Sequence, residues 1–459
     1  MKKYLLRAVY ILLFLVGCCA IYAGLDYIVS DDTSSQTRVT FHDFYDEGTV
    51  DYLFVGPSHT IHAINAVSLS KTLDASVFNL ATSSQDFIGG YYVLKDAIET
   101  GDIRHVIYEV SISRFEIEET LEVKTYIISD YMKSQWIRAQ YLTDALGSDQ
   151  YPNGFFRLRR NFDPQNPPTA EKFAKVYTNK QDEAYLAYEG TEDYFGKGQW
   201  SEPTSWAYEG TAALNTREWN LDNFPLEQIQ PKEWEYFLKI IQLCKEKDVD
   251  LTFYIPPYSD LYLMRFEQYE EITQRVYDAA AENGITVVDL NLAKKEYLPI
   301  EISDFFNSDH VNDAASVKIA AFFTQYLKDP DKDYFYDSLH DNHPINDDII
   351  AVLYRRLYAQ DDGLEFYWPQ PETTSLRMEI SALSWVERPV DVRVWKTTQS
   401  ITGESVWFDG EEIVGLKLDE YTTQFRMPYD NMRSFYRVQL LDPDTGEVLY
   451  ETITRFNMT

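Results

Sequence analysis

The chain is predicted to be an α/β protein: a doubly wound parallel sheet with a long lid insertion and an all-β sandwich at the carboxyl end. Two patterns predict this. Short apolar runs alternate with helical patterns over residues 45–330, which is typical of a parallel sheet covered on both faces. About seven short alternating runs within 370–459 indicate an immunoglobulin-like sandwich. Residues 331–369, between these regions, are interpreted as a helical linker.

The first strand, Tyr52–Val55, is a continuous apolar run that leads into a tight turn. Gly56 and Pro57 shape this turn and present Ser58 at the carboxyl end of the strand, where open α/β sheets bind ligands. Ser58 is therefore a candidate nucleophile, and the alternative is that it caps the next helix. Further strands are predicted at 76–80, 105–110, 250–255 and 285–290, and helices at 87–98, 231–246, 267–283 and 314–327.

One insertion, residues 115–230, interrupts this alternation and is rich in aromatic and turn residues. It is interpreted either as a lid or substrate platform over the active face, or as a surface elaboration. It contains a tight basic cluster: Arg157, Arg159 and Arg160. In the carboxyl-terminal domain, strands are predicted at 376–383, 390–395, 406–408, 414–418, 423–427, 436–441 and 448–453.

Residues 1–30 are predicted to be a transmembrane anchor. Three basic residues come first: Lys2, Lys3 and Arg7. The run Ala8–Val29 is long enough to span a bilayer, and the basic flank should stay in the cytoplasm with the bulk of the chain outside the cell. Leu15–Cys18 also fits a lipoprotein processing site, although apolar residues continue well past it and favour an uncleaved anchor. A short polar tether is expected at Ser30–Thr37.

Composition narrows the function. The formal net charge is −33, so attraction to nucleic acid or another polyanion is disfavoured. Only three cysteines occur, and two of them, Cys18 and Cys19, lie inside the apolar segment. The remaining Cys244 cannot form an internal disulfide with the exported part, and no cysteine cluster suggests zinc.

A nucleophilic serine needs a base, and the chain has seven histidines. His310 lies in the loop between the last predicted strand and the last predicted helix, at the sheet edge that also carries Ser58. His59 and His62 are closer in sequence, but neighbours along a turn and helix rarely point back at the serine. They are expected to be surface or helix-face residues.

Four segments in this order resemble the SGNH (GDSL-type) hydrolase superfamily, in particular its membrane-anchored branch with DltD-like and cell-wall O-acyltransferase proteins. They are Gly56–His59, Phe78–Gln85, Ile255–Tyr258 and Asp309–Asn312. The resemblance covers residues 48–328. It implies a flavodoxin-like fold and attack of a serine on an acyl ester.

The resemblance also implies roles for individual residues. Ser58 would be the nucleophile and His310 the proton relay. The family's orienting aspartate lies three residues before the histidine, where this chain has Asn307. An amide can hold a tautomer but cannot stabilise an imidazolium by charge, so Asp304 and Asp309 are the alternatives.

The family's third-block asparagine, an oxyanion donor, has no match in Glu109–Arg114 after the third strand. The oxyanion would then be bound by the Ser58 amide and by an amide near Ala81 or Thr82. Gln85 and Lys197 are further candidate substrate-binding residues.

The sequence thus predicts an extracytoplasmic, membrane-anchored serine acyl-ester enzyme that transfers or removes an acyl group on a cell-envelope polymer. No metal or cofactor is expected, and a membrane-bound O-acyltransferase is a candidate partner. The alternative is a catalytically degenerate SGNH-like protein that binds glycan or partner proteins. The missing aspartate and asparagine support that alternative.

Overall fold

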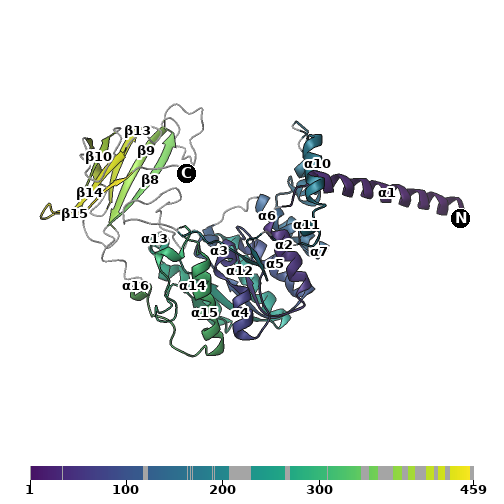
Figure 1. Ribbon diagram of the computed structural model, residues 1–459, viewed down its shortest axis with the longest axis horizontal. Coiled ribbons are helices and arrows are strands. Elements are labelled where there is room, and N and C mark those ends of the chain that lie inside the picture. The colour runs from purple at the N-terminus through teal and green to yellow at the C-terminus, as the bar shows by residue number, and fades with distance from the viewer. Residues whose placement is uncertain are drawn as a thin grey trace. The chain divides into compact units, whose positions relative to one another are not determined.

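The structure is a computed structural model (Figure 1). It describes residues 2–33, 35–116, 122–162, 164–165, 167, 169–188, 190, 192–205, 229–263, 269–307, 309–342, 351–359, 376–384, 391–397, 410–417, 422–428 and 435–454. The chain forms two compact units. The first comprises residues 1–206, 224–259 and 268–337, and the second comprises 207–223, 260–267 and 338–459. Each unit is described by itself.

The first unit is an α/β domain with a five-stranded parallel sheet in the order β2-β1-β3-β6-β7. Its strands are β1 (Thr49–Val55), β2 (Val77–Asn79), β3 (Asp102–Glu109), β6 (Asp250–Ile255) and β7 (Thr286–Asp289). Leu53 of β1 pairs with Phe78 of β2 on one side and with Val106 of β3 on the other. The predicted α/β class and its five strands are confirmed.

Helices flank this sheet, and each predicted helix is present with slightly different ends. They are α2 (Gln36–Asp46), α3 (Ser58–Ala63), α4 (Ala66–Leu73), α5 (Phe87–Thr100), η1 (Ile112–Glu116), α12 (Pro231–Lys247), α14 (Tyr269–Glu282), η3 (Ile302–Asp304) and α15 (Asp313–Lys328). Proline at the first turn of α12 and Gly284 just after α14 are the start and stop signals that the sequence carries.

Aromatic packing shows that both faces of the sheet are buried. Tyr254 of β6 packs against Phe323 of α15, with ring centroids 5.8 Å apart, and Phe54 of β1 packs on the same ring at 5.3 Å. Phe253, the residue before Tyr254, points to the other face and packs on Phe237 of α12 at 5.0 Å. The long apolar strands therefore follow from burial on two faces.

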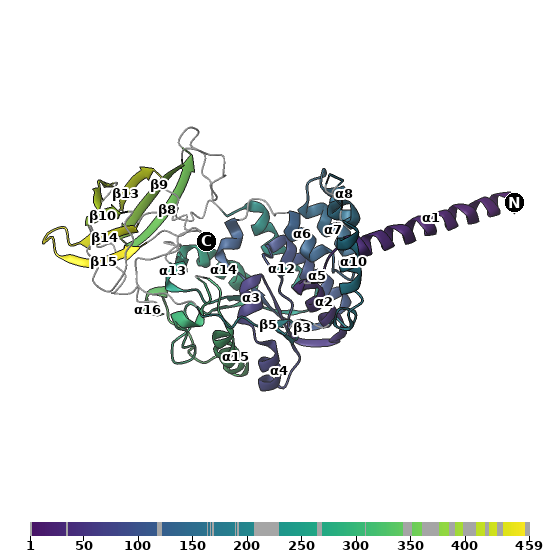
Figure 2. The same cartoon turned by 45° about the horizontal axis from the view of Figure 1, so that its top comes forward.

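The described part of the insertion is mainly helical. It contains α6 (Glu122–Ser129), α7 (Gln135–Ala145), α8 (Tyr151–Phe155), α9 (Arg157–Asn161), α10 (Ala170–Asn179), α11 (Glu183–Leu186), β4 (Tyr194–Gly196) and β5 (Gln199–Trp200). Helices α6 and α7 pack on α5, and α9 and α10 contact α1 (Lys2–Val29). Figures 1 and 2 show α10 beside the end of α1.

Helix α1 is long and apolar enough over Tyr4–Val29 to cross a membrane, as a signal sequence would also be. The predicted polar tether after it is wrong. Ser30 is 1% exposed, and its hydroxyl accepts a hydrogen bond from Asn161 at 2.7 Å. Helix α2 then begins at Gln36, with the Ser35 side chain as its cap.

The described residues of the second unit form two short helices and two four-stranded antiparallel sheets, in the orders β11-β10-β14-β15 and β12-β13-β9-β8. Its elements are α13 (Asp260–Leu263), α16 (Leu339–Asn342), β8 (Ala351–Ala359), β9 (Leu376–Ser384), β10 (Asp391–Thr397), β11 (Glu411–Ile413), β12 (Leu416–Lys417), β13 (Thr422–Pro428), β14 (Phe435–Leu441) and β15 (Val448–Thr454).

A separate antiparallel β region at the carboxyl end is thus confirmed. The helical linker predicted at 331–369 is wrong where β8 lies, because β8 is a strand that pairs with β9 along its whole length. The strand predicted at 406–408 lies outside the described residues.

Candidate active site

Ser58 is the first residue of α3, directly after the turn that follows β1. Pro57 occupies the N-cap position, and no side chain caps this helix end, so Ser58 is not the helix cap. A Cβ on Gly56 would lie 2.6 Å from the Glu109 Cβ, so only glycine fits the turn. The turn therefore presents the Ser58 hydroxyl without using it for capping.

The structure brings Ser58 and His310 together. The Ser58 Oγ lies 2.7 Å from the His310 Nε2, and both residues are partly exposed. The two groups that face the other ring nitrogen, Nδ1, are the acceptor oxygens of Asp309 and Asn307. Nδ1 consequently carries the proton, and the Nε2 lone pair is free to accept the Ser58 proton.

Within the part of the chain that the structure describes, two side chains contact the His310 Nδ1. The Asp309 Oδ1 lies 3.0 Å away and the Asn307 Oδ1 lies 3.2 Å away. The Asn307 Oδ1 also accepts the backbone N–H groups of Asp309 at 3.1 Å and of His310 at 2.8 Å. Asn307 therefore shapes the turn, and this turn brings the carboxylate of Asp309 back to the imidazole beside it in sequence.

Asp304, the third residue considered as the orienting group, has other partners. Its buried carboxylate accepts from Lys318 at 2.6 Å and from the backbone N–H of Glu301 at 2.7 Å. These bonds fix the loop ahead of α15. Asp304 therefore holds the loop and has no described contact with His310.

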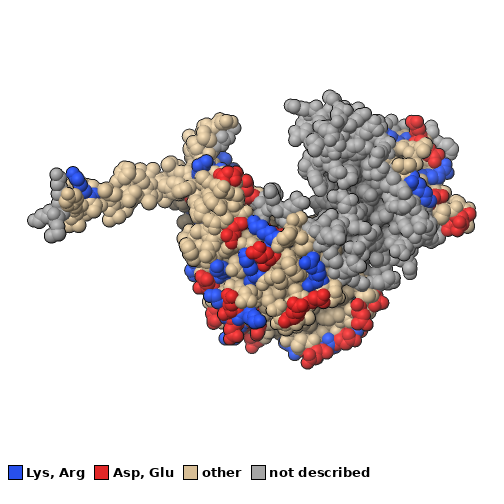
Figure 3. Space-filling view, turned by 180° about the vertical axis from the view of Figure 1, so that it is seen from behind, with Lys and Arg blue, Asp and Glu red and all other residues tan. Residues whose placement is uncertain are grey.

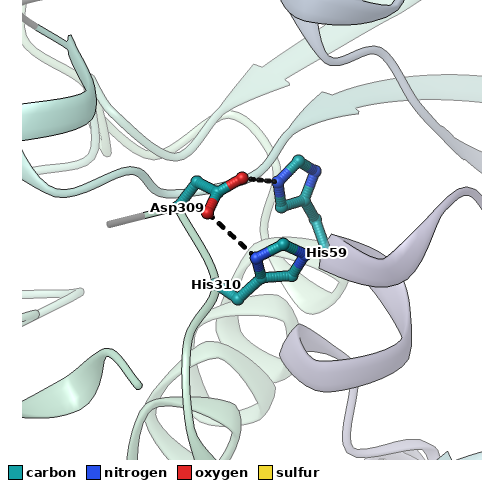
Figure 4. Close-up of side chains that lie close together, drawn as sticks. All are labelled: His59, Asp309 and His310. Carbon is teal, nitrogen blue, oxygen red and sulfur yellow. Dashed lines mark hydrogen bonds and ion pairs between the residues drawn. The ribbon is translucent and has the colours of Figure 1, made fainter. Parts of the chain in front are cut away.

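His59, which the sequence analysis expected to be a surface or helix-face residue, is a buried residue of α3 at the centre of the site. Its Nε2 lies 3.1 Å from the Asp309 Oδ2, and its Nδ1 lies 3.3 Å from the Oε1 of Glu109. Figure 4 shows the Asp309 carboxylate between the two imidazoles, one from α3 and one from the loop before α15. The contacts form one chain, Glu109–His59–Asp309–His310–Ser58.

Glu109, the last residue of β3, is 0% exposed and is held from several sides. Thr60 donates to its Oε2 at 2.5 Å, and the Thr60 hydroxyl also contacts the Tyr254 hydroxyl at 2.6 Å. Arg114, also buried, donates to the Glu109 backbone carbonyl at 2.8 Å. A buried carboxylate with this many partners is a fixed part of the fold.

The pKa shifts of Glu109, His59 and Asp309 indicate that negative and positive charges alternate along this chain of contacts. Burial opposes the charged form of His59, but hydrogen bonds with Asp309 and Glu109 outweigh it and raise its pKa to about 10. Burial likewise opposes ionisation of both carboxylates, yet the pKa of Asp309 is lowered by His310 and His59, and the pKa of Glu109 is lowered mainly by His59. At neutral pH, His59 is thus a cation between two anions.

Aromatic rings surround the His310 imidazole. Phe306 lies 5.4 Å from it between centroids, and His62 lies 5.9 Å from it. Burial, together with the nearby His310, lowers the pKa of His62 to about 4, so His62 is neutral at physiological pH. The His62 ring contributes apolar surface beside the reacting pair.

The second sequence block lies beside the Ser58 turn. The Thr82 N–H donates to the Gly56 carbonyl at 3.1 Å, so this amide fixes the turn. Gln85 is buried, and its amide donates to the Thr82 hydroxyl at 3.0 Å. Ala81 packs in a small core cluster with Trp200. Of the predicted oxyanion amides, that of Thr82 is already engaged.

Lys197 is placed away from the site, contrary to its predicted role. Its ammonium is paired with Glu47, which precedes β1, whereas Ser58 follows the opposite end of this strand. Its backbone N–H donates to the Asp43 carboxylate at 2.8 Å. Lys197 therefore fixes the β4–β5 hairpin against α2.

The segment after β5 does reach the His310 loop. The Asp313 carboxylate, at the start of α15, accepts from the Ser201 hydroxyl at 2.5 Å and from the Glu202 N–H at 2.8 Å. Asn312 donates to the Thr204 carbonyl at 3.2 Å. This part of the insertion supports the loop that carries His310.

His59, Asp309 and His310 also have metal-ligand types, with ligand atoms within 4.8 Å of one another. A metal ligand must be a deprotonated imidazole. Because the pKa of His59 is raised to about 10, its Nε2 carries a proton at neutral pH and donates to Asp309. A metal ion bound here would have to displace the proton that His59 donates to Asp309.

The His59 ion pairs should make stability depend on pH. A pKa raised from 6.5 to about 10 gives stabilisation that is complete below about pH 6.5 and is lost as the pH rises toward 10. Replacing His59 by glutamine removes the cation between the Glu109 and Asp309 carboxylates, and we expect a loss of about 3–5 kcal/mol in the free energy of unfolding at pH 6. Urea denaturation should show this loss shrinking toward pH 10.

The control is His42→Gln, because His42 is partly exposed, stacks on Tyr188 and, among the described residues, forms an ion pair with Asp46 alone, at 3.5 Å. Its loss should be about 1 kcal/mol or less. A His59→Gln loss that does not change between pH 6 and 10 would contradict a charged His59.

Comparison with known proteins adds no family. No family model matches the chain, and no curated protein matches it. Among solved structures, the chain is similar to β-glucosidase 3B from Thermotoga neapolitana in complex with α-D-glucose, at 8% identity and a TM-score of 0.11, over 89% of this chain and 75% of that one. A TM-score this low carries no argument about fold or function.

Proposed function

We propose that the protein is an extracytoplasmic, membrane-anchored serine acyl-ester enzyme of the SGNH type, an O-acyltransferase or esterase that modifies a cell-envelope polymer. The observation that carries the proposal is the 2.7 Å contact between the Ser58 Oγ and the His310 Nε2, with a carboxylate on Nδ1. The strand order β2-β1-β3-β6-β7 supports a doubly wound, flavodoxin-like domain, because that order is found in such folds. The two antiparallel sheets support a carboxyl-terminal sandwich.

In the first half-reaction, the Ser58 Oγ attacks the ester carbonyl carbon while the His310 Nε2 takes the hydroxyl proton. The carbonyl π bond opens and its oxygen becomes an oxyanion. The Ser58 amide, which starts α3, and the Ala81 amide are the proposed donors. The carbon–oxygen bond to the donor alcohol then breaks, and that alcohol leaves with the proton from His310.

In the second half-reaction, His310 removes a proton from an acceptor hydroxyl, which attacks the acyl-Ser58 carbonyl. Collapse of the second tetrahedral intermediate returns the proton to Ser58. An acceptor on a polymer gives transfer, and water gives hydrolysis. The net charge of −33 favours a neutral or cationic acceptor over a polyanion.

His59 and Glu109 act through Asp309 and are proposed as positioning residues. The His59 cation holds one carboxylate oxygen, so the other oxygen stays directed at the His310 Nδ1. Two anions and one cation leave one net negative charge next to the imidazole. This charge stabilises the imidazolium that forms when Ser58 attacks.

In this proposal, α1 is an uncleaved membrane anchor, and its basic amino terminus lies in the cytoplasm. The alternative function is a catalytically degenerate SGNH-like protein that binds glycan or partner proteins. The absence of the third-block asparagine from Glu109–Arg114 favours it. The 2.7 Å contact between the Ser58 Oγ and the His310 Nε2 favours the enzyme function.

A fluorophosphonate probe tests the proposal directly. The activated Ser58 oxygen should form a bond to phosphorus and expel fluoride, and mass spectrometry should locate the adduct on the Ser58 peptide. Protein denatured before treatment is the control and should not react. If the native protein also fails to react, the binding alternative gains.

A further inference from the structure

The end of α1 is joined rigidly to the helical part of the insertion. Lys180 donates its ammonium protons to the backbone carbonyls of Tyr27, at 3.0 Å, and of Ser30. The Asp32 carboxylate pairs with Arg157 at 2.8 Å and with Lys180 at 3.0 Å. The Lys180 side chain is only 3% exposed. These contacts fix the position of α9 and α10 relative to α1.

The charges at this joint are well compensated. Burial opposes ionisation of Asp32, but hydrogen bonds and charges from Arg157 and Lys180 outweigh it and lower its pKa. Breaking a buried ion pair of this kind costs about 3–5 kcal/mol. Arg157, part of the basic cluster in the sequence, is therefore a structural residue of the joint.

The length of α1 determines how deep in the bilayer the contact between α1 and the insertion lies. The 26 residues Tyr4–Val29 span about 39 Å at 1.5 Å per residue, more than the hydrocarbon thickness of about 30 Å, which needs about 20 residues. If the 20 residues that cross the hydrocarbon layer start at Tyr4, they end at Ala23. If they start after the last basic residue, they cover Ala8–Tyr27. Tyr22 lies inside the hydrocarbon boundary in both cases.

Phe156 packs at the level of Tyr22. The two ring centroids are 6.3 Å apart, and the Leu158 N–H donates to the Tyr22 hydroxyl at 3.3 Å. Phe156 is nevertheless 55% exposed. Tyr177 is 52% exposed beside Tyr27, with centroids 6.5 Å apart. Aromatic rings of the folded domain thus lie uncovered against the membrane-spanning segment.

We propose that Phe156, Phe162 and Tyr177, here called the aromatic collar, insert into the outer interface of the lipid bilayer around α1. Phe162, which directly follows α9, is 39% exposed. The proposal rests on the membrane anchor of the proposed function. Lipid is the occupant because the collar continues the surface of a helix that lipid must cover, and aromatic rings favour the membrane interface.

Figure 3 is consistent with this placement. It shows α1 as a projection with charged atoms near its free end and again where it meets the domain, and none drawn between. The collar gives the domain a second attachment to the same leaflet. Unit 1 is then held in one orientation on the membrane, and the helical part of the insertion serves as a membrane platform.

Site-specific fluorescence in the full-length protein tests the collar. Cys18 and Cys19 are replaced by alanine, and Cys244 is kept because it is buried and burial raises the pKa of its thiol to about 12. Phe156→Cys is labelled with an environment-sensitive dye in vesicles of phosphatidylcholine and phosphatidylglycerol, and Tyr177→Cys repeats the measurement. Val317→Cys, equally exposed at 57% on α15, is the control.

Lipids with a spin label near the headgroup should quench about half or more of the emission at 156 and 177, because interfacial groups lie about 5–10 Å inside the headgroup boundary. Emission at 317 should not change. Vesicle-bound protein with unquenched dye at 156 and 177 overturns the collar. Blue-shifted but unquenched emission also overturns it, because protein would then cover the rings. Protein that contains α1 but does not bind vesicles would disprove the anchor itself, while the fluorophosphonate reaction tests the enzyme separately.

Discussion

Replacing Ser58 with alanine is expected to reduce turnover of an activated acetyl ester by about 10⁴-fold or more, because the nucleophile and its hydrogen bond to His310 are both lost. The variant should fold normally, since the Ser58 hydroxyl does not cap α3. Steady-state rates and denaturation curves, measured side by side, separate lost chemistry from lost stability.

The control is Ser68→Ala, because Ser68 is a partly exposed serine on the next helix, α4, and the site does not use its hydroxyl. This variant should keep the wild-type rate. Turnover that persists in Ser58→Ala would assign the activity to another group and remove the central argument for the enzyme. An inert wild type on every ester tried would favour the glycan-binding or partner-binding alternative.

The α/β class and its five strands could be predicted because burial on two faces leaves a strong local signal. Strand β6, for example, places Phe253 and Tyr254 on opposite faces, and both side chains are apolar. Strand β8 carries no such signal. Its sequence, Ala-Val-Leu-Tyr-Arg-Arg-Leu-Tyr-Ala, contains good helix formers, and it becomes a strand by pairing with β9.

The candidate site was only partly predictable. Ser58 and His310 could be found because both follow strand ends at one edge of the sheet. Asp309 depends on the turn that Asn307 holds, a local geometry that residue spacing does not reveal. Residues next to each other usually point apart, and here the loop turns the side chain back.

Two buried groups were missed for different reasons. Glu109 did leave a signal, because a carboxylate that ends an otherwise apolar buried strand needs a partner. Its partner, His59, could not be identified from spacing, since α3 turns this side chain inward toward β3. Lys197 was the opposite error. It was named as a candidate substrate-binding residue, but its ammonium pairs with Glu47.

The chain of contacts leads to a second large effect, at Asp309. Replacing Asp309 with asparagine should slow turnover by about 10³–10⁴-fold, because a neutral amide cannot stabilise the His310 imidazolium. The same change leaves the His59 cation with Glu109 as its remaining carboxylate partner. Asn307→Ala should cost about tenfold, because it loosens the turn but leaves the carboxylate in place. The rates of Asp309→Asn and Asn307→Ala, measured on the same ester, show how much the carboxylate charge and the geometry of the turn each contribute to turnover.

Asn307→Asp completes the comparison. If Asn307 were the orienting group, a carboxylate at this position would accelerate the reaction by restoring charge at Nδ1. The structure already places the Asp309 carboxylate closer, at 3.0 Å against 3.2 Å, so we expect no acceleration. A second anion beside Asp309 should instead disturb the turn through like-charge repulsion. Two results together would overturn this assignment: an Asn307→Asp variant that is faster than wild type, and an Asp309→Asn variant that keeps nearly the wild-type rate. Residue 307 would then be the orienting group, and Asp309 would be only the structural partner of His59.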